Sequence, residues 1–425
     1  MALLGEFAHG LLLAVLVLHC ALGASITWIV VQHLRYRRSA LREESLLLNS
    51  PLPTDADLPH VLVQIPTYNE GNLVLRSAVA VASLDWPRDK LHVQILDDST
   101  DDSVTFAQEA VQRVAAAGVD AKLLHREHRS GFKAGALGEG LRASDQPFVA
   151  IFDADYAPPA HFLRACIHPM LADPRVALVQ ARCDYLNRDE NLLTRAQQRI
   201  LDAHFGVEQP TRAWTGQVLP FNGTCGIWRR AAIDEAGGWR SDTLAEDLDL
   251  SYRVQLRGWR GRFLVTVAAP GVLPDTFEAW RAQQFRWEKG FTEVGRKLWP
   301  SLWRSNLSLG KKLISQAHLS ETVAMPINVA EILLCAVDFT VGSGVTAIVV
   351  AGLLVAQLQG KLGRAIMLLL GQQTVRGASL WRESLCIPLV ACVELFNLIL
   401  TLRGVADALI GRSTEFVRTP KKVVG

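Results

Sequence analysis

The chain has 425 residues, of which 49% are hydrophobic and 20% are charged, and its formal net charge is +2. This length predicts two or three structural units. The hydrophobic content excludes a disordered chain, and the near-neutral charge argues against a nucleic-acid partner. Seven cysteines without a C-x-x-C pair argue against a disulfide-stapled module or a zinc ribbon. The mean hydropathy of +0.17 averages a polar middle and two apolar ends.

An uncharged apolar run near the start predicts a membrane anchor. Residues 7–34 contain no Asp, Glu, Lys or Arg, which is longer than the roughly 20 residues that a helix needs to cross a bilayer. Glu6 precedes the run and the basic cluster 35–38 follows it, so a cleaved signal peptide fits less well. The basic cluster places the part that follows in the cytoplasm.

Apolar stretches return near the end of the chain and predict three or four further membrane helices. Residues 339–360 are uncharged and long enough to span, and residues 320–337 and 384–402 span if their acids are tolerated, whereas 365–375 is too short alone. Three acids lie in or beside these stretches: Glu331, Asp338 and Glu394. They either end helices and bond to other side chains or mark a polar path through the membrane, where acids are costly.

In the middle of the chain, short apolar strands alternate with helical stretches, which predicts an α/β fold with a mainly parallel sheet. The expected strands are 61–66, 92–96 and 148–152, and the expected helices are 73–83, 103–116 and 133–143. Ligands of such sheets bind at the carboxyl ends of the strands. The sequence has no G-x-G-x-x-G after the first strand and no G-x-x-x-x-G-K-[ST], which disfavours a dinucleotide dehydrogenase or a P-loop NTPase.

Acidic residues follow two of the expected strands. Asp97 and Asp98 end the second strand, and Asp153 and Asp155 follow the third. Residues two apart in an extended segment point to the same side, so Asp153 and Asp155 can converge on one hard cation, which takes oxygen ligands. Two further D-x-D triplets elsewhere in the chain show that the pattern alone is weak, and a solvated turn is the alternative.

Three other segments point to chemistry only when they are taken together. The glycine-interrupted basic segment 129–137 allows close backbone approach, and its Lys133 supplies a point charge for a phosphate; alone, it is a loop with a solvated lysine. Glu246 and Asp247 begin an apolar helix, where acids also stabilise the first turn. Segment 283–287 carries an arginine that can fork onto a diphosphate and a tryptophan that can stack on a sugar, or it is an amphipathic helix at the membrane surface.

In their order along the chain, these motifs resemble those of the inverting family 2 glycosyltransferases, whose membrane-embedded members include cellulose synthase, hyaluronan synthase and the plant mannan and glucan synthases. The ordered motifs are Asp97-Asp98, Asp153-x-Asp155, Glu246-Asp247 and Gln283-x-x-Arg286-Trp287. Segments 129–137, 221–224, 237–239 and 415–421 look most like the mannan/glucan branch and its bacterial relatives. The resemblance covers residues 61–287 well and both ends more loosely.

The resemblance implies a GT-A domain that uses a nucleotide-sugar donor, UDP-glucose or GDP-mannose, with Mg²⁺ or Mn²⁺, to extend a β-linked polysaccharide. It implies that Asp247, beside Glu246, deprotonates the acceptor hydroxyl and that Lys133 contacts the diphosphate. The implied nucleotide ligands are Tyr68, Glu70, Asp97 and Asp98, the implied metal ligands are Asp153 and Asp155, and Gln283, Arg286 and Trp287 would frame the acceptor and the leaving diphosphate. One base without a covalent intermediate means inversion at the anomeric carbon.

The sequence departs from the family pattern at three positions outside the core catalytic residues. Ala245 replaces the usual threonine, Cys183 stands where tryptophan is frequent, and Val272 stands where glutamate is common. These departures leave the acceptor open. One alternative is therefore transfer of a single sugar to a lipid, and another, of a different class, is a non-catalytic subunit of a polysaccharide export complex.

We expect a multi-pass protein of the inner or plasma membrane with a cytoplasmic catalytic domain. The expected parts are a transmembrane anchor at 1–38, the GT-A domain at 39–276, interfacial helices at 277–315, and transmembrane helices with a basic tail at 316–425. Leucines and tryptophans recur at helical spacing in 298–303 beside basic residues, which predicts a helix on the membrane surface, with core packing as the alternative. The expected partners are the donor, a glycan or lipid acceptor, the bilayer and polysaccharide export proteins.

Overall fold

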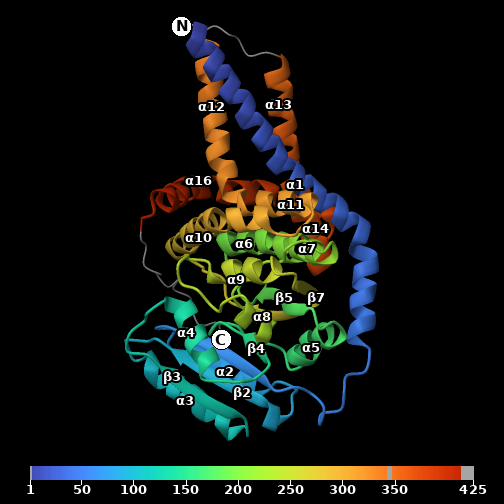
Figure 1. Cartoon of the computed structure of the whole chain (residues 1–425), viewed down its shortest axis with the longest axis vertical. Coiled ribbons are helices and arrows are strands. Elements are labelled where there is room, and N and C mark those ends of the chain that lie inside the picture. The colour runs from blue at the N-terminus through green and yellow to red at the C-terminus, as the bar shows by residue number, and fades with distance from the viewer. Residues whose placement is uncertain (1, 342–346, 413–425) are drawn as a thin grey trace. The chain divides into compact units, whose positions relative to one another are not determined.

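The computed structural model describes residues 2–341 and 347–412, which fall into two compact units. Figure 1 labels their helices and strands. The described residues of the helical unit lie within Met1–Arg35, Arg199–Glu208 and Arg281–Thr414, and those of the sheet unit lie within Tyr36–Gln198 and Gln209–Trp280.

The described part of the sheet unit contains one sheet of seven strands. In chain order they are β1 (Val61–Thr67), β2 (Leu91–Asp97), β3 (Asp120–His125), β4 (Phe148–Ile151), β5 (Val176–Tyr185), β6 (Gly226–Arg229) and β7 (Arg260–Gly271). The spatial order is β3-β2-β1-β4-β6-β5-β7, and every neighbouring pair is parallel except those that β6 makes with β4 and β5. The predicted mainly parallel α/β sheet is therefore confirmed, and the three expected strands correspond to β1, β2 and β4.

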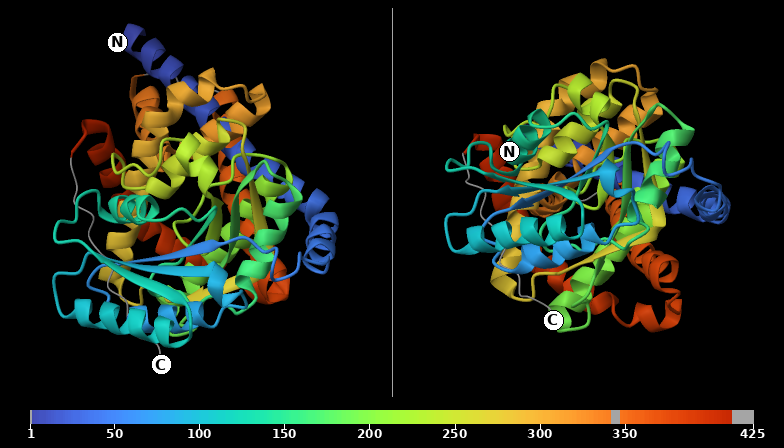
Figure 2. Two further views of the ribbon diagram at one scale, coloured as in Figure 1. Left: turned by 60° about the horizontal axis from the view of Figure 1, so that its bottom comes forward. Right: turned by 90° about the horizontal axis from the view of Figure 1, so that it is seen from below.

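Helices pack on both faces of β1 to β3. The helices that lie wholly in the sheet unit, on these and the other strands, are η1 (Arg88–Lys90), α2 (Leu73–Ala82), α3 (Ser103–Ala116), α4 (Phe132–Arg142), α5 (Phe162–Ala172), α7 (Gln209–Trp214), α8 (Arg230–Glu235) and α9 (Glu246–Gln255). In Figure 2, α3 (cyan) lies along one face of these strands and α4 (teal) lies on the other. The side chains of Gln64 and Gln94 bond each other at 3.0 Å and donate to carbonyls of α4. A Cβ at Gly140 would lie 2.5 Å from both glutamines, so glycine lets α4 approach the strands that carry the acids.

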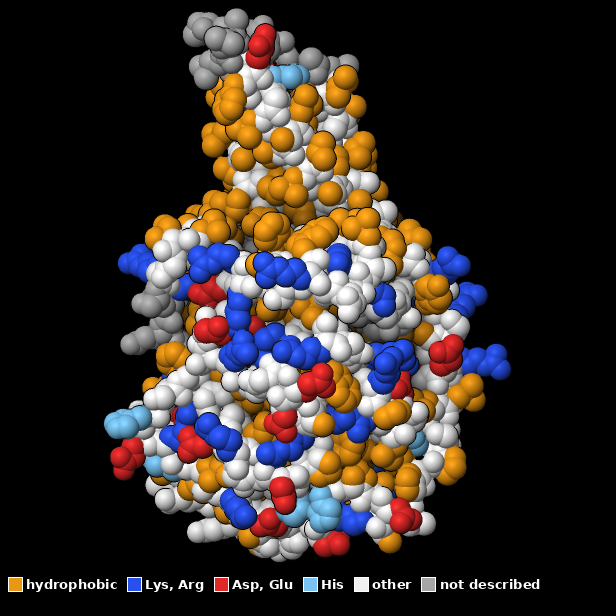
Figure 3. All heavy atoms as spheres, viewed as in Figure 1, with side chains coloured by type: hydrophobic (Ala, Val, Ile, Leu, Met, Phe, Trp, Pro, Cys, Tyr) orange, Lys and Arg blue, Asp and Glu red, His pale blue; other side chains and the backbone are white. Residues whose placement is uncertain are grey.

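In the helical unit, α12, α13 and the part of α1 up to Arg35 run side by side (Figure 1). Apolar side chains cover their outer surface (Figure 3). The helices that lie in or enter this unit are α1 (Ala2–Leu48), α6 (Leu192–Ala203), the π-helical turn η2 (His204–Glu208), α10 (Phe277–Arg304), α11 (Leu309–Leu319), η3 (Glu321–Val323), α12 (Ala324–Val341), α13 (Ala347–Gln357), the π-helical turn η4 (Leu358–Leu362), α14 (Gly363–Arg376), α15 (Leu380–Ser384) and α16 (Ile387–Ile410).

Among the described residues, four helical segments are long and apolar enough to cross a membrane, by length and composition. They are Gly5–Leu48, Glu321–Thr340, Ile348–Arg376 and Leu380–Ile410, which indicates a membrane-associated chain. The expected spanning helix 339–360 includes residues 342–346, which lie outside the described residues, so it stays a prediction. Segment 415–421, which contributed to the resemblance, lies outside the described residues.

The acids of α12 each pair with one imidazole of α1. His19 Nδ1 lies 2.9 Å from both carboxylate oxygens of Glu331, and His9 Nδ1 lies 3.2 Å from Asp338 Oδ2. Both carboxylates are buried. Of the two interpretations that the sequence left open for these acids, bonding to other side chains is the one that this geometry supports.

The leucines and tryptophans of segment 298–303 lie in two different environments, the core and the surface. Leu298 and Leu302 are buried, whereas Trp299 and Trp303 are exposed on α10. The leucines therefore act as core residues, and the tryptophans stand on the surface of the helical unit, where an indole suits an interface.

Candidate active site

Lys133 lies at the centre of a group of charged side chains at the carboxyl end of the sheet. Its ammonium contacts Asp153 Oδ1 at 2.5 Å and donates to Gly223 O at 2.9 Å. A Cβ at Gly223, whose φ is +75°, would lie 3.2 Å from Lys133 Nζ and 3.0 Å from Asp247 Oδ2. The structure thus brings together three residues that the sequence places far apart: Lys133, Asp153 and Asp247.

Helix starts present two of these side chains. Gly131, at φ +72°, takes the left-handed conformation just before α4 and so places Lys133 in its first turn. Glu246 and Asp247 occupy the first turn of α9, where the helix dipole favours acids. Ala245 precedes them without a side-chain cap, and Asp247 Oδ1 instead accepts the N–H of Leu248 at 2.7 Å. This oxygen is therefore fixed against the helix, while Oδ2 faces Gly223.

Burial and neighbouring charges in this group shift the pKa of Asp247, the candidate base, and that of Lys133. Burial, followed by the neighbouring Glu246 carboxylate, raises the pKa of Asp247 to about 7, although the Lys133 ammonium and the Leu248 N–H act in the opposite direction. Burial lowers the pKa of Lys133, but the carboxylates of Asp153, Glu246 and Asp247 outweigh it, so the net pKa is raised and the lysine stays charged. Three carboxylates therefore act together on the ammonium of Lys133.

The segment that carries Asp153 and Asp155 is a turn, so the expectation of an extended segment is wrong. β4 ends at Ile151, and the N–H of Tyr156 donates to Asp153 O at 2.9 Å, which closes the turn. The Asp153 side chain is 34% exposed, whereas Asp155 is buried and its Oδ2 accepts the N–H of Val272 at 3.3 Å. Within the described residues, no group of three or more His, Cys, Asp or Glu side chains could hold a metal.

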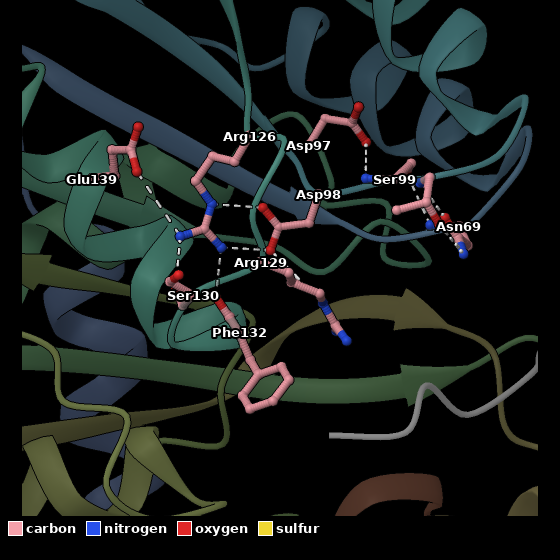
Figure 4. A network of polar contacts seen from close by, with 10 residues as sticks. Asn69, Asp97, Asp98, Ser99, Arg126, Arg129, Ser130, Phe132 and Glu139 are labelled. Carbon is pink, nitrogen blue, oxygen red and sulfur yellow. Dashed lines mark hydrogen bonds and ion pairs between the residues drawn. The ribbon is translucent and has the colours of Figure 1, made fainter. Parts of the chain in front are cut away.

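The four residues expected at the nucleotide gather at the ends of β1 and β2, where Figure 4 shows part of their polar network. Both acids have basic partners: His125 Nδ1 lies 2.7 Å from Asp97, and Arg126 binds Asp98 through two contacts. Tyr68 lies beneath the guanidinium of Arg129, at 3.6 Å from its ring centroid. Glu70 belongs to the turn that leads from β1 into α2.

The third expected group belongs to the helical unit. Gln283, Arg286 and Trp287 lie on α10, with Gln283 buried and the indole of Trp287 43% exposed. An exposed indole beside an arginine is compatible with sugar stacking and phosphate binding.

The turn at 221–224 holds the group around Lys133 in place, a role that its local sequence does not predict. Gly223 contributes its carbonyl to Lys133, and Thr224 Oγ1 accepts the N–H of Asp153 at 2.9 Å. Gln180 on β5 bonds both ends of the turn, and Ser251 Oγ accepts the N–H of Phe221 at 2.7 Å. The available signal was the Asn-Gly-Thr turn chemistry; its long-range partners carry no local signal.

Comparison with known proteins agrees with this architecture. The family described as glycosyltransferase like family 2 matches residues 59–290. The chain is 45% identical over 268 residues to glucomannan 4-beta-mannosyltransferase 2 of Arabidopsis thaliana, covering 62% of the chain and 49% of that relative. It is 42% identical over 274 residues to glucomannan 4-beta-mannosyltransferase 1 of Oryza sativa subsp. japonica, covering 62% and 53%. The chain thus spans about half the length of these curated relatives.

A solved structure shares the fold. Mannosyltransferase PcManGT from Pyrobaculum calidifontis, in complex with GDP-Man and Mn²⁺, superposes with a TM-score of 0.55 at 20% identity, covering 92% of this chain and 100% of that one. The GT-A expectation is therefore confirmed. With a matched segment that includes β1, Lys133, Asp153, Asp247 and the start of α10, the chain belongs to the glycosyltransferase-like family 2.

Proposed function

We propose that the chain is an inverting, metal-dependent glycosyltransferase that moves mannose from GDP-mannose to a growing β-linked glycan at a membrane. The observation that carries the proposal is the group of three carboxylates around the ammonium of Lys133 at the carboxyl end of a GT-A sheet. The similar proteins described above are mannosyltransferases, which supports mannose over glucose.

Asp247 is the proposed general base. A carboxylate whose pKa is about 7 accepts a proton from a hydroxyl more readily than an ordinary aspartate does, yet is largely ionised at slightly alkaline pH. Gly223 has no side chain to fill the space in front of Asp247 Oδ2, which leaves room for an acceptor hydroxyl. The acceptor oxygen attacks C1 of the donor as the proton passes to Asp247, and the C1–oxygen bond to the diphosphate breaks.

The residues present fit a hard divalent cation. Asp153 Oδ1 contacts the ammonium of Lys133, which shows that a positive group can reach this oxygen. The Asp153 carboxylate is also partly exposed. Mg²⁺ and Mn²⁺ bind through one or two carboxylates plus waters and phosphate oxygens, so Asp153 and Asp155 suffice as protein ligands. A bound ion would neutralise charge on the departing diphosphate. Lys133, released from Asp153, would turn its ammonium to the same diphosphate.

The remaining assignments belong to the same proposal. Tyr68, Glu70, Asp97 and Asp98 form the nucleotide side, and Gln283, Arg286 and Trp287 bind the acceptor and the leaving diphosphate. We place the catalytic domain at 39–276 on the cytoplasmic face of an inner or plasma membrane, between the anchor at 1–38 and the helices at 277–315 and 316–425. Donor, glycan acceptor and bilayer are its partners.

The test uses purified full-length protein in nanodiscs with labelled GDP-mannose or UDP-glucose and Mn²⁺, Mg²⁺ or EDTA. We expect release of GDP from GDP-mannose, loss of that release in EDTA, and a water-soluble oligosaccharide product by size analysis. Asp247→Asn should abolish release, whereas the matched control Asp242→Asn, an exposed acid just before α9, should not.

The outcomes separate the alternatives. Release of UDP alone would mean that the donor is UDP-glucose. An organic-soluble product carrying one sugar would mean that the acceptor is a lipid and not a glycan. If the protein releases no nucleotide from any donor with either metal, the enzymatic proposal is wrong and a non-catalytic role takes its place.

A further inference from the structure

β7 carries an irregularity in the middle of the strand. Leu264 lies opposite Ala181 of β5, but the next pair along is Ala268 with Arg182, so residues 265–267 have no opposite residue on β5. Such a bulge sets the register of the strand beyond it, because a slip by one residue turns every later side chain to the other face of the sheet. The position of the end of β7 therefore depends on what holds residues 265–267.

The carboxylate of Glu44, on α1, binds the donors of this bulge. Its Oε2 accepts the N–H of Val265 at 3.1 Å, and its Oε1 accepts the N–H and the hydroxyl of Thr266 at 2.8 and 2.6 Å. From β5, Arg182 Nε donates to Val265 O at 3.2 Å. Extra residues of a bulge lose their partners in the strand ladder, and these two side chains replace them. All four residues belong to the sheet unit.

Glu44 is the buried point of this part of α1. Of residues 34–57, all of which the structure describes, Glu44 alone is buried, at 6% exposure, and its neighbour Glu43 is exposed. A helix that docks for stability alone would bury apolar side chains, because taking a carboxylate out of water costs free energy that its hydrogen bonds only offset. The contact therefore specifies where the bulge lies more than it stabilises the fold.

The end of β7 supports the turn at 153–157, which carries the proposed metal ligands. Pro270 O accepts the N–H of Ala157 at 2.9 Å, and Val272 donates its N–H to Asp155 Oδ2 at 3.3 Å. Pro270 and Val272 both follow the bulge. A shift of the end of β7 along β5 would therefore carry the Val272 N–H away from the Asp155 carboxylate.

We propose that Glu44 is a positioning residue for the metal site: by holding the bulge of β7, it sets the register that delivers the Val272 N–H to Asp155. This inference rests on the proposed function, in which Asp155 is a ligand of Mg²⁺ or Mn²⁺. A hydrogen bond to a coordinating carboxylate fixes its orientation, and its loss weakens metal binding. Glu44 lies on the helix that also contains the proposed membrane anchor, so that helix contributes to the metal site as well as to the membrane part.

Hydrogen–deuterium exchange in the metal-free protein tests the coupling without donor or metal. The full-length protein in nanodiscs is compared as wild type, as Glu44→Ala and as the control Glu43→Gln, which replaces the exposed neighbour on the same helix. We expect Glu44→Ala to speed exchange at 265–267 and also, by at least about 3-fold, at 268–273 and 153–157. Faster exchange confined to 265–267 would make Glu44 a local contact and overturn the inference.

The metal requirement of transfer gives the second measurement. The Mn²⁺ concentration at half-maximal transfer should rise about 10-fold in Glu44→Ala, while kcat at saturating Mn²⁺ stays within about 3-fold of the wild-type value. Glu44→Gln keeps one acceptor oxygen for Thr266 and should give an intermediate value, and it decides the matter if Glu44→Ala does not fold. Glu43→Gln should match the wild type.

The outcomes keep this inference apart from the proposed function. If the Glu44 variants lower kcat or Tm but leave the Mn²⁺ requirement unchanged, Glu44 has a structural role only, and the inference is overturned while the proposed function stands. If the wild-type protein transfers sugar without a divalent metal, the proposed metal dependence fails, and this inference fails with it.

Discussion

Carboxylates occur in two contrasting settings in this molecule. Around Lys133, the three carboxylates of Asp153, Glu246 and Asp247 share one ammonium. Between α1 and α12, Glu331 and Asp338 each lie against an imidazole of their own. Both settings are buried or partly buried, so the difference lies in how the carboxylates are grouped, three together or one at a time, rather than in solvent exposure.

The grouping of the carboxylates distinguishes a site suited to chemistry from contacts that hold helices together. A buried acid with its own partner has its hydrogen-bonding satisfied and serves chiefly to specify how two helices meet. Carboxylates gathered close together cost free energy to hold in place and raise one another's pKa, which is the arrangement expected where a cation or a proton arrives during function. Each prediction below acts on one side of this contrast.

The largest expected effect is that Asp247→Asn lowers activity while it raises thermal stability. Removing the general base should lower kcat by about 10²- to 10⁴-fold. Because the folded-state pKa of Asp247 is raised to about 7 from an ordinary 3.8, this group favours folding at low pH and loses that contribution as the pH rises toward 7. At pH 8 the neutral asparagine should therefore raise Tm by a few degrees, measured by thermal unfolding in nanodiscs.

A matched variant of a compensated acid gives the opposite result. Asp249 is buried on the same helix and bonds Arg253 at 2.7 Å, so Asp249→Asn should lower Tm. If Asp247→Asn destabilises the protein as much as Asp249→Asn does, Asp247 is a structural acid and the contrast between the two settings fails.

The second prediction breaks a one-to-one pair. Glu331→Leu or His19→Leu alone leaves a buried polar partner unsatisfied and should cost about 1–3 kcal/mol. The double variant removes both polar groups and should recover most of that loss, because an apolar pair of similar volume often replaces a buried ion pair without cost. Thermal unfolding of all four proteins in nanodiscs measures the coupling.

Transfer activity of the same double variant decides between the two roles that the sequence left open for Glu331. We expect a stable double variant to transfer sugar at close to the wild-type rate. A double variant that is stable but inactive would show that the pair belongs to a polar path through the membrane.

The fold was largely accessible from the sequence because its signals are local. The expected helix 103–116 coincides with α3, and β1 and β2 are only one or two residues longer than the expected strands. An error arose where a boundary depends on a turn: β4 ends at Ile151, before the closed turn at Asp153.

The candidate site could be predicted only in part. Its acids were recognised by resemblance to the family, but the basic residues that pair with them were not. The pairing of Asp97 with His125 follows from the register of β2 on β3, which places these residues opposite each other although they are 28 positions apart. Arg126 reaches Asp98 by the same register. No local pattern encodes such pairings, since they depend on which strands become neighbours.

The smallest expected effect sharpens the contrast by changing the number of acids around Lys133. Glu246 raises the pKa of Asp247, so Glu246→Gln should lower that pKa. The base is active when deprotonated, so kcat/KM should rise with pH through about 7 in the wild type, and this limb should move to lower pH in Glu246→Gln whatever happens to the plateau. Glu109→Gln, an exposed acid of α3, is the control and should leave the limb in place. A limb that stays near pH 7 in Glu246→Gln would mean that burial sets the pKa of Asp247, and that the group of acids around Lys133 serves to bind a cation and not to adjust the base.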